Sequence, residues 1–281
     1  KRKVTTLHFV PSLLQVFLEE EGLEETCRSV RQVISSGEAL SSDTQEKFFK
    51  RVNAKLHNLY GPTETAVDVT FWECKPEARG GRVPIGHPIA NIQAYILDGQ
   101  MEPVAIGVAG ELYLGGEGLG RGYQQQPGLT AERFVPHPYA RAAGARLYRT
   151  GDVARYRADG AIEFLGRVDQ QVKLRGYRIE LGEIESVLRQ HEGVGEAVVV
   201  VRGAGAEQRL VGYVTAAARN GGSSAGRELS RRLREHLQCR AVLALQRSEQ
   251  FAFQVFPDPG VIHQRAKHAD MAEVEMHILD A

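Results

Sequence analysis

The stretch that decides the fold is KLHNLYGPTE, residues 55–64, in which an apolar run ends at a sharp turn. The run Lys55–Tyr60 predicts a strand, because Gly61-Pro62 would close it. In open α/β sheets, ligands bind outside the carboxyl ends of the strands. A carboxylate just past such an end, here Glu64, can hold Mg²⁺, which takes one or two protein oxygens beside substrate phosphates. A turn carrying a solvated glutamate is the alternative.

Strand and helix alternate upstream of this stretch. The predicted elements are strands at 4–10 and 29–35 and helices at 11–20 and 42–52. Pro11 suits a helix start, since its missing N–H would have no partner there. The Ser-Ser-Asp run at 41–43 can cap the second helix. This alternation predicts a layered α/β arrangement.

The pattern changes twice further downstream. Between residues 82 and 165, short β-like runs separated by Gly, Pro and Asp-Gly predict a small antiparallel sheet or barrel, with a hairpin at Asp159-Gly160. A small α+β domain follows. Its predicted elements are a strand at 172–179, a helix at 183–191 with Ile184, Val187 and Leu188 on one face, strands at 196–201 and 210–215, and a helix at 227–237. One strand is then missing, unless the apolar run 251–256 supplies it.

We therefore predict an α/β protein with three successive parts. The first, 1–168, combines an α/β layer (1–80) with a β-rich part (81–168). The second is a small C-terminal domain at 169–237, and the third is a divergent tail at 238–281.

Composition narrows the class of protein. Lys+Arg and Asp+Glu both number 35, so no excess of basic charge favours nucleic acid as a partner. The 3 cysteines lie far apart without a CxxC pair, which predicts ordinary thiols and no metal cluster. No apolar run approaches the roughly 20 residues of a membrane span. We predict a cytoplasmic protein with no nucleic-acid or membrane partner, and we expect its start, KRKV, to be internal to a longer chain.

Three more motifs bear on chemistry. YRTGD (148–152) presents Asp152 at a turn, where a carboxylate can accept ribose hydroxyls. GRVD (166–169) offers the Arg167 guanidinium, suited to phosphate, next to a candidate hinge. Each of these is, by itself, equally well an ordinary surface pair. The glycine-rich run at 110–123 lacks the Gly-Lys-Ser/Thr of a P-loop, so we expect structural turns there and no direct catalysis.

In this order, the motifs resemble the adenylate-forming superfamily, and within it the adenylation domains of nonribosomal peptide synthetases. The resemblance covers about 5–237 and is most specific in GRVDQQVKLRGYRIELGEIE (166–185), which separates the chain from acyl-CoA ligases and luciferases. It implies the C-terminal half of the adenylate-forming fold: part of a layered α/β domain, a small β-barrel-like subdomain and an incomplete α+β subdomain.

The resemblance also implies a reaction. Such domains join an amino acid to the α-phosphate of ATP, with Mg²⁺, and then pass the acyl group to the phosphopantetheine thiol of a carrier domain. The implied partners are a small amino acid, a peptidyl carrier domain and a condensation domain of the same synthetase.

By motif, the resemblance implies an adenine site. Residues implied to line it are Gly37, Glu38 and Ala39. Asn58 would lie near the adenine amino group, Tyr60 would flank the base, and Phe164 would stack on it where the family usually has Tyr.

The phosphates, the ribose and the hinge are implied in the same way. Thr63 would contact phosphate, Glu64 would hold Mg²⁺, and Asp152 would bind the ribose hydroxyls. Arg167 would steady ribose and phosphate, and Asp169 matches the hinge about which the small domain turns. The loop that approaches the pantetheine tunnel would contain Gly176.

Six positions match those that determine specificity in the family: His8, Ile34, Ser36, Leu59, Val67 and Asp68. Three polar and three apolar side chains suit a small hydroxylated amino acid, because a site that hydrogen-bonds a hydroxyl rejects analogues lacking it. The set resembles that of serine-activating domains. We expect serine, with threonine or another small polar acid next.

The sequence also departs from the family. Its phosphate loop, the Asp that grips the substrate amino group and its C-terminal Gly-Lys loop match nothing here, and nothing around Lys267 resembles that loop. We expect weak nucleotide binding without turnover, and a poorly ordered tail from a shifted reading frame or a foreign junction. The alternatives are a non-catalytic remnant that serves as a docking module, and a relative that activates a fatty or aryl acid.

Overall fold

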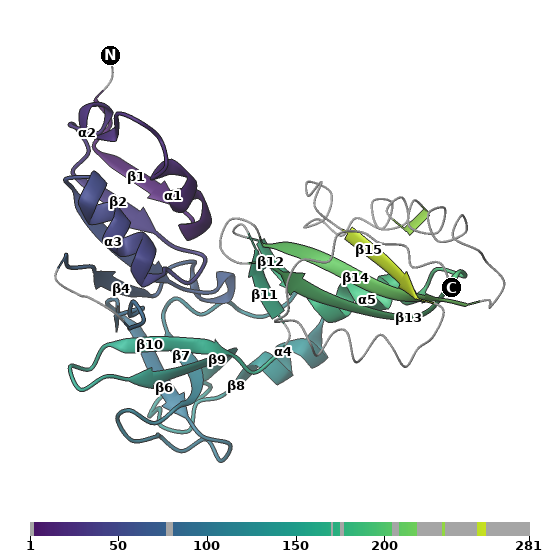
Figure 1. The fold of residues 1–281 in the computed structure, drawn as a ribbon. Helices are drawn as coiled ribbons and strands as arrows, with labels where there is room; N and C mark the ends of the chain where they lie inside the picture. The colour runs from purple at the N-terminus through teal and green to yellow at the C-terminus, as the bar shows by residue number, and fades with distance from the viewer. Residues whose placement is uncertain are drawn as a thin grey trace. The chain divides into compact units, whose positions relative to one another are not determined.

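The computed structural model describes residues 3–76, 81–169, 171–174, 177–203, 208–217, 232–233 and 252–256. The chain divides into two compact units, Lys1–Asp169 and Gln170–Ala281, each with its own sheets (Figure 1). Helices and strands are mixed in both units, as predicted. Within the described ranges, no helix has the length and apolar character that crossing a membrane requires.

A five-stranded sheet opens the first unit (Figure 1). Its strands, in spatial as in chain order, are β1 (Thr6–Phe9), β2 (Gln32–Ser35), β3 (Lys55–Tyr60), β4 (Thr70–Glu73) and β5 (His87–Pro88). The first three run parallel, and β4 and β5 each pair antiparallel with the preceding strand. The strand predicted at 55–60 is confirmed, and it lies at the centre of the sheet.

Helices pack against this sheet through an apolar core. They are α1 (Pro11–Phe17), α2 (Leu23–Thr26) and α3 (Ser42–Arg51). Leu14 of α1 and Phe48 of α3 are fully buried in one cluster with Val33 and Leu56 of the strands. Since side chains alternate along a strand, the neighbours of Val33 and Leu56 point to the opposite face.

The predicted start of α3 is confirmed, whereas the predicted end of α1 was wrong. Ser41 caps α3, because its hydroxyl accepts a hydrogen bond from the Thr44 amide at 3.1 Å. The first helix was predicted to reach residue 20 but ends at Phe17. Three consecutive glutamates at 19–21 follow, and negative charge is unfavourable at the carboxyl end of a helix.

The second sheet follows the order β10-β9-β7-β6, with β8 paired to β9. Its strands are β6 (Ile92–Leu97), β7 (Gly110–Gly116), β8 (Phe134–Pro136), β9 (Arg146–Tyr156) and β10 (Ile162–Arg167), and helix α4 (Pro127–Arg133) precedes β8. All pairs are antiparallel, and in the described residues the order ends at β10 and β6, which do not pair with each other. Of the two predicted alternatives, these strands therefore form an open sheet. The hairpin at Asp159-Gly160 is confirmed, because Ile162 lies opposite Tyr156.

The second unit corrects one predicted strand. The run 172–179 is an antiparallel pair, β11 (Gln171–Leu174) and β12 (Tyr177–Glu180), with Leu174 opposite Tyr177. The single strand was wrong because the chain reverses direction between these two residues, at a position where the sequence has Arg-Gly. The helix predicted at 183–191 is confirmed as α5 (Leu181–Arg189), which begins and ends two residues earlier and buries Ile184 and Leu188.

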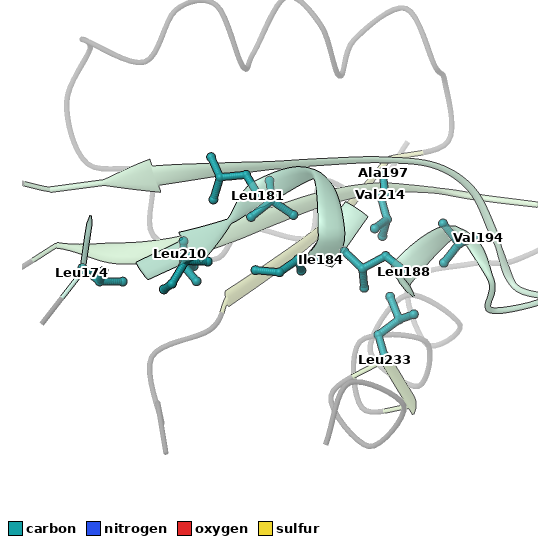
Figure 2. Packing of buried hydrophobic residues seen from close by; sticks show 11 residues of the cluster. Leu174, Leu181, Ile184, Leu188, Val194, Ala197, Leu210, Val214 and Leu233 are labelled. Carbon is teal, nitrogen blue, oxygen red and sulfur yellow. The ribbon is translucent and has the colours of Figure 1, made fainter. Parts of the chain in front are cut away.

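A three-stranded sheet completes this unit. Strands β13 (Val194–Arg202) and β14 (Arg209–Ala216) are antiparallel, and β15 (Ala252–Phe256) pairs parallel with β14. The apolar run at 251–256 therefore supplies the strand that was missing from the predicted α+β domain. Figure 2 shows Leu188 of α5, Val214 of β14 and Leu233 among the side chains of the shared core. The predicted helix at 227–237, other than residues 232–233, and the tail beyond Phe256 lie outside the described residues.

Cys74, at the end of β4, is buried in the core of the first unit. Burial raises the pKa of its thiol to about 12, so at pH 8 only about one molecule in ten thousand carries the reactive thiolate. We expect iodoacetamide at pH 8 to leave Cys74 unlabelled in the native protein and to label it in urea, as read by peptide mass spectrometry. Equal labelling rates in both conditions would contradict this burial.

Candidate active site

One buried carboxylate joins three strands of the first unit. Asp152 of β9 is 2% exposed, and its two oxygens accept hydrogen bonds from the Tyr60 hydroxyl and from Nη1 of Arg167. Arg167 lies opposite Asp152 in the β9–β10 pairing, whereas Tyr60 ends β3 in the other sheet. The structure thus brings together three residues that the sequence connected only by motif.

Tyr60 acts as a donor in this cluster. Burial raises the pKa of its phenol well above the ordinary value, and the negative charge of Asp152 raises it further. The hydroxyl therefore stays protonated at neutral pH and donates a hydrogen bond to the carboxylate.

Arg167 links Asp152 to the last residue of the first unit. Its Nε and Nη2 atoms donate to the two carboxylate oxygens of Asp169 at 2.7 and 2.9 Å, and Nη2 also donates to the Thr150 carbonyl at 3.0 Å. Arg133 adds a longer ion pair, with 3.9 Å between its Nη1 and Oδ2 of Asp169. A two-pronged guanidinium–carboxylate contact fixes geometry as well as charge. Asp169, the predicted hinge residue, is thus held by Arg167, which was predicted to contact ribose and phosphate.

Gly151 makes this arrangement possible. Its φ of 74° is left-handed, and a Cβ there would lie 2.8 Å from Oδ2 of Asp169 and 2.9 Å from Nη2 of Arg167. A side chain at this position would displace the ion pair.

Glu64 is held by a second group of residues. It lies in the 3₁₀ turn η1 (Thr63–Thr65), and its Oε1 accepts a hydrogen bond from the Tyr123 hydroxyl at 2.7 Å. The Tyr148 hydroxyl lies 3.5 Å from that of Tyr123. Burial, with hydrogen bonding to Tyr148 and Glu64, raises the pKa of Tyr123, which therefore stays protonated. Thr63 is exposed.

The implied adenine residues lie on β3, on β10 and in the segment that follows β2. Asn58 is 2% exposed, and its Nδ2 donates to the Pro84 carbonyl at 2.8 Å. Its Oδ1 is buried and has no hydrogen-bond partner among the described residues. After β2, the Glu38 carboxylate accepts from the Ser12 amide at 3.0 Å. Phe164 is half-buried against the core of the second sheet. Gly37 is half-buried and Ala39 is exposed.

The implied specificity residues fall into two groups. On β1 and β2, Nε2 of His8 lies 2.8 Å from the Ser36 hydroxyl, and His8 is opposite Ile34 in the parallel register. These side chains belong to the face opposite the helices. The other three are Leu59, half-buried on β3, and the turn residues Val67 and Asp68, of which Val67 is 62% exposed.

Sequence reasoning missed four residues of this region. Tyr123, Arg133 and the Thr150 and Pro84 carbonyls contact predicted site residues. Thr150 was inside a motif that was singled out, and Tyr123 ends the glycine-rich run. Arg133 and Pro84 carry no local signal, because only tertiary structure brings them to the site. Gly176 lies outside the described residues.

Comparison with known proteins finds similar sequences and structures. Residues 1–124 match the family model of AMP-binding enzymes. Phosphinothricin tripeptide synthetase PhsB of Streptomyces viridochromogenes is 54% identical over 213 residues, which are 75% of this chain and 18% of that protein. Enterobactin synthase component F of Escherichia coli is 48% identical over 225 residues, 75% of this chain and 17% of that protein. The chain thus spans a small part of the length of these relatives.

Solved structures share the fold. An artificially fused adenylation–PCP di-domain from Klebsiella oxytoca, NpsA-ThdA, superimposes with a TM-score of 0.72 at 29% identity, over 89% of this chain and 48% of that one. The crystal structure of IdnL1 superimposes with a TM-score of 0.76 at 26% identity, over 90% of this chain and 51% of that one. Residues 1–124 are therefore similar to AMP-binding enzymes, and the chain shares its fold with an adenylation domain of a nonribosomal peptide synthetase.

Proposed function

We propose that this chain contributes the ribose, adenine and amino-acid contacts of an ATP-dependent adenylating ligase. In that reaction the amino-acid carboxylate attacks the α-phosphate of ATP, an aminoacyl-adenylate forms and pyrophosphate leaves. The acyl group then passes to the phosphopantetheine thiol of a peptidyl carrier domain, in a synthetase that also holds a condensation domain. The observation that carries the proposal is the buried cluster of Tyr60, Asp152 and Arg167.

The nucleotide contacts follow from the hydrogen-bonding capacity of this cluster. An ionised carboxylate offers about four acceptor positions, so Asp152 can accept ribose hydroxyls in addition to its bonds from Tyr60 and Arg167. Arg167 would bring positive charge toward the phosphates. The buried Oδ1 of Asn58 is an acceptor that the adenine amino group would satisfy. Its orientation is fixed, because Nδ2 is bonded to Pro84.

The Glu64 carboxylate fits Mg²⁺. It is a half-buried hard oxygen donor on a turn that follows a strand end, and Mg²⁺ needs only one or two such groups when phosphates and water complete its shell. When bound, Mg²⁺ would offset the phosphate charge that opposes carboxylate attack. Within this chain, Glu64 would hold the ion, and Tyr123 keeps its carboxylate in place.

Serine is the amino acid that the pocket residues favour. The hydroxyl of Ser36 and the imidazole of His8 already form a polar pair that a substrate hydroxyl could join. Asp68 adds a carboxylate, and Ile34 and Leu59 add apolar walls that limit size. Threonine is the next candidate.

The test is amino-acid-dependent exchange of pyrophosphate into ATP by the complete adenylation domain that contains this sequence. Serine should give the highest rate, and the 281-residue chain alone should give none. Preference for a large apolar acid would refute the serine assignment. Absence of exchange with every amino acid would refute the amino-acid ligase, and absence of exchange with fatty and aryl acids as well would favour a non-catalytic docking module.

The pocket is tested by replacing Ser36 with alanine. Ser36→Ala should lower the ratio of kcat/KM for serine over that for alanine about tenfold, because a hydrogen bond near 1.4 kcal/mol is lost for serine alone. Ser35→Ala is the matched control. Ser35 is the buried neighbour, on the helix-covered face with Val33, and its replacement should leave the ratio within about twofold. Equal losses for both substrates would show that Ser36 does not read the side chain.

A further inference from the structure

We propose that the glycine-rich segment 115–123 is a positioning element for Glu64, with Tyr123 as its positioning residue; this rests on the magnesium role proposed for Glu64. Sequence reasoning left the segment without a function beyond its turns. Two contacts in the structure connect it to that carboxylate.

The segment meets Glu64 through both backbone and side chain. The Gly120 amide donates to the Glu64 carbonyl at 2.7 Å, which fixes the main chain of the turn. The Tyr123 hydroxyl donates to Oε1 of the same residue at 2.7 Å, which fixes the side chain. Glu64 is therefore held at two points, by Gly120 and Tyr123, which lie 56 and 59 positions further along the chain.

Tyr123 is itself held from several sides. Its amide donates to the Thr130 hydroxyl at 2.9 Å, and its ring packs edge-on against Phe134, with 5.8 Å between centroids. The Tyr148 hydroxyl lies 3.5 Å from its own. Arg146 donates to the carbonyls of Gly120 and Arg121, at 3.1 and 2.9 Å, and so ties the segment to β9.

This arrangement has a defined consequence for a metal ligand. A carboxylate at a turn rotates about its side-chain bonds, and a hydrogen bond to one oxygen restricts that rotation. Outer partners of this kind orient metal ligands, and their loss typically reduces metal affinity or activity about 10-fold to 100-fold. The phenol thus sets the direction in which Glu64 presents its oxygens.

The experiment replaces Tyr123 with phenylalanine in the complete adenylation domain. Tyr123→Phe should raise the Mg²⁺ concentration for half-maximal pyrophosphate exchange about tenfold, while kcat at saturating Mg²⁺ changes less than about threefold. Binding of Mn²⁺, as a spectroscopic substitute, to the domain with ATP should weaken by a similar factor in electron paramagnetic resonance titrations. This second measurement does not depend on turnover.

Tyr113→Phe is the matched control. The Tyr113 hydroxyl also donates to a glutamate, at 3.3 Å, but that glutamate is Glu111 and not Glu64. Its replacement should leave the Mg²⁺ and Mn²⁺ dependence unchanged, even where it lowers the urea midpoint as much as Tyr123→Phe does.

Glu64→Gln distinguishes a failure of the positioning role of Tyr123 from a failure of the magnesium role of Glu64. If Glu64→Gln raises the Mg²⁺ requirement and Tyr123→Phe behaves like Tyr113→Phe, the positioning role is wrong and the proposed function stands. If Glu64→Gln leaves the Mg²⁺ and Mn²⁺ dependence unchanged, the magnesium role fails and the positioning role fails with it.

Discussion

Arg167→Met should lower the free energy of unfolding of the first unit by about 4 kcal/mol, because it strands a buried carboxylate. The Arg167 side chain is 10% exposed and that of Asp152 is 3% exposed, so water cannot replace the lost guanidinium. Asp169 loses both of its short contacts with Arg167 at the same time. Urea unfolding followed by fluorescence measures the change, since the single tryptophan, Trp72, lies in β4 of this unit.

Arg155→Met is the control for this prediction. Arg155 pairs with Glu163 at 2.8 Å on the same β9–β10 hairpin, but its side chain is 45% exposed. Glu163 keeps a second partner, because Nη1 of Arg157 lies 3.7 Å from its Oε1. The loss of Arg155 should therefore cost less than about 1 kcal/mol. Adding Asp152→Asn to Arg167→Met should recover at least about 1 kcal/mol, because the stranded charge is removed. If Arg167→Met and Arg155→Met lowered the free energy of unfolding equally, the ion pair of Asp152 and Arg167 would not be desolvated.

Gly61→Ala should lower the free energy of unfolding by about 3 kcal/mol, the upper part of the range for overpacked sites. A Cβ on Gly61 would lie 2.3 Å from the carbonyl oxygen of Val67. That backbone cannot move easily, since Ala66 and Val67 already have left-handed φ values of 66° and 74°. Trp72 fluorescence in urea again reports the change.

The same substitution should disturb the proposed pocket, because the displaced turn carries Val67 and Asp68. Gly99→Ala is the control: in the part of the chain that the structure describes, no atom other than those of its two chain neighbours lies within 4 Å of a Cβ at that position. Stability should therefore change by less than about 1 kcal/mol. A Gly61→Ala protein as stable as Gly99→Ala would mean that the turn relaxes without cost.

The strands that fill the cores were the most predictable part of the fold. Strand β3, the Asp159-Gly160 hairpin and the apolar face of α5 each follow from a short pattern that the structure confirms. The prediction was wrong for the run 172–179, which we predicted as a single strand. Its apolar residues shift from even positions, Val172 and Leu174, to odd positions, Tyr177 and Ile179. This break in the alternation coincides with the reversal of the chain between Leu174 and Tyr177.

The sequence by itself determined the fold class, the order of the elements and the residues that supply charge, because periodicity and turn chemistry are local properties of the chain. Only tertiary structure decided which of those charges meet. Asp152 accepts hydrogen bonds from Tyr60, 92 residues away, and from Arg167 across a strand pair, and Tyr123 reaches Glu64 from 59 residues away. A hydrogen bond forms only when donor and acceptor come within about 3 Å of each other. For residues so far apart in the sequence, the packing of the two sheets decides that distance, and no local sequence pattern encodes this packing.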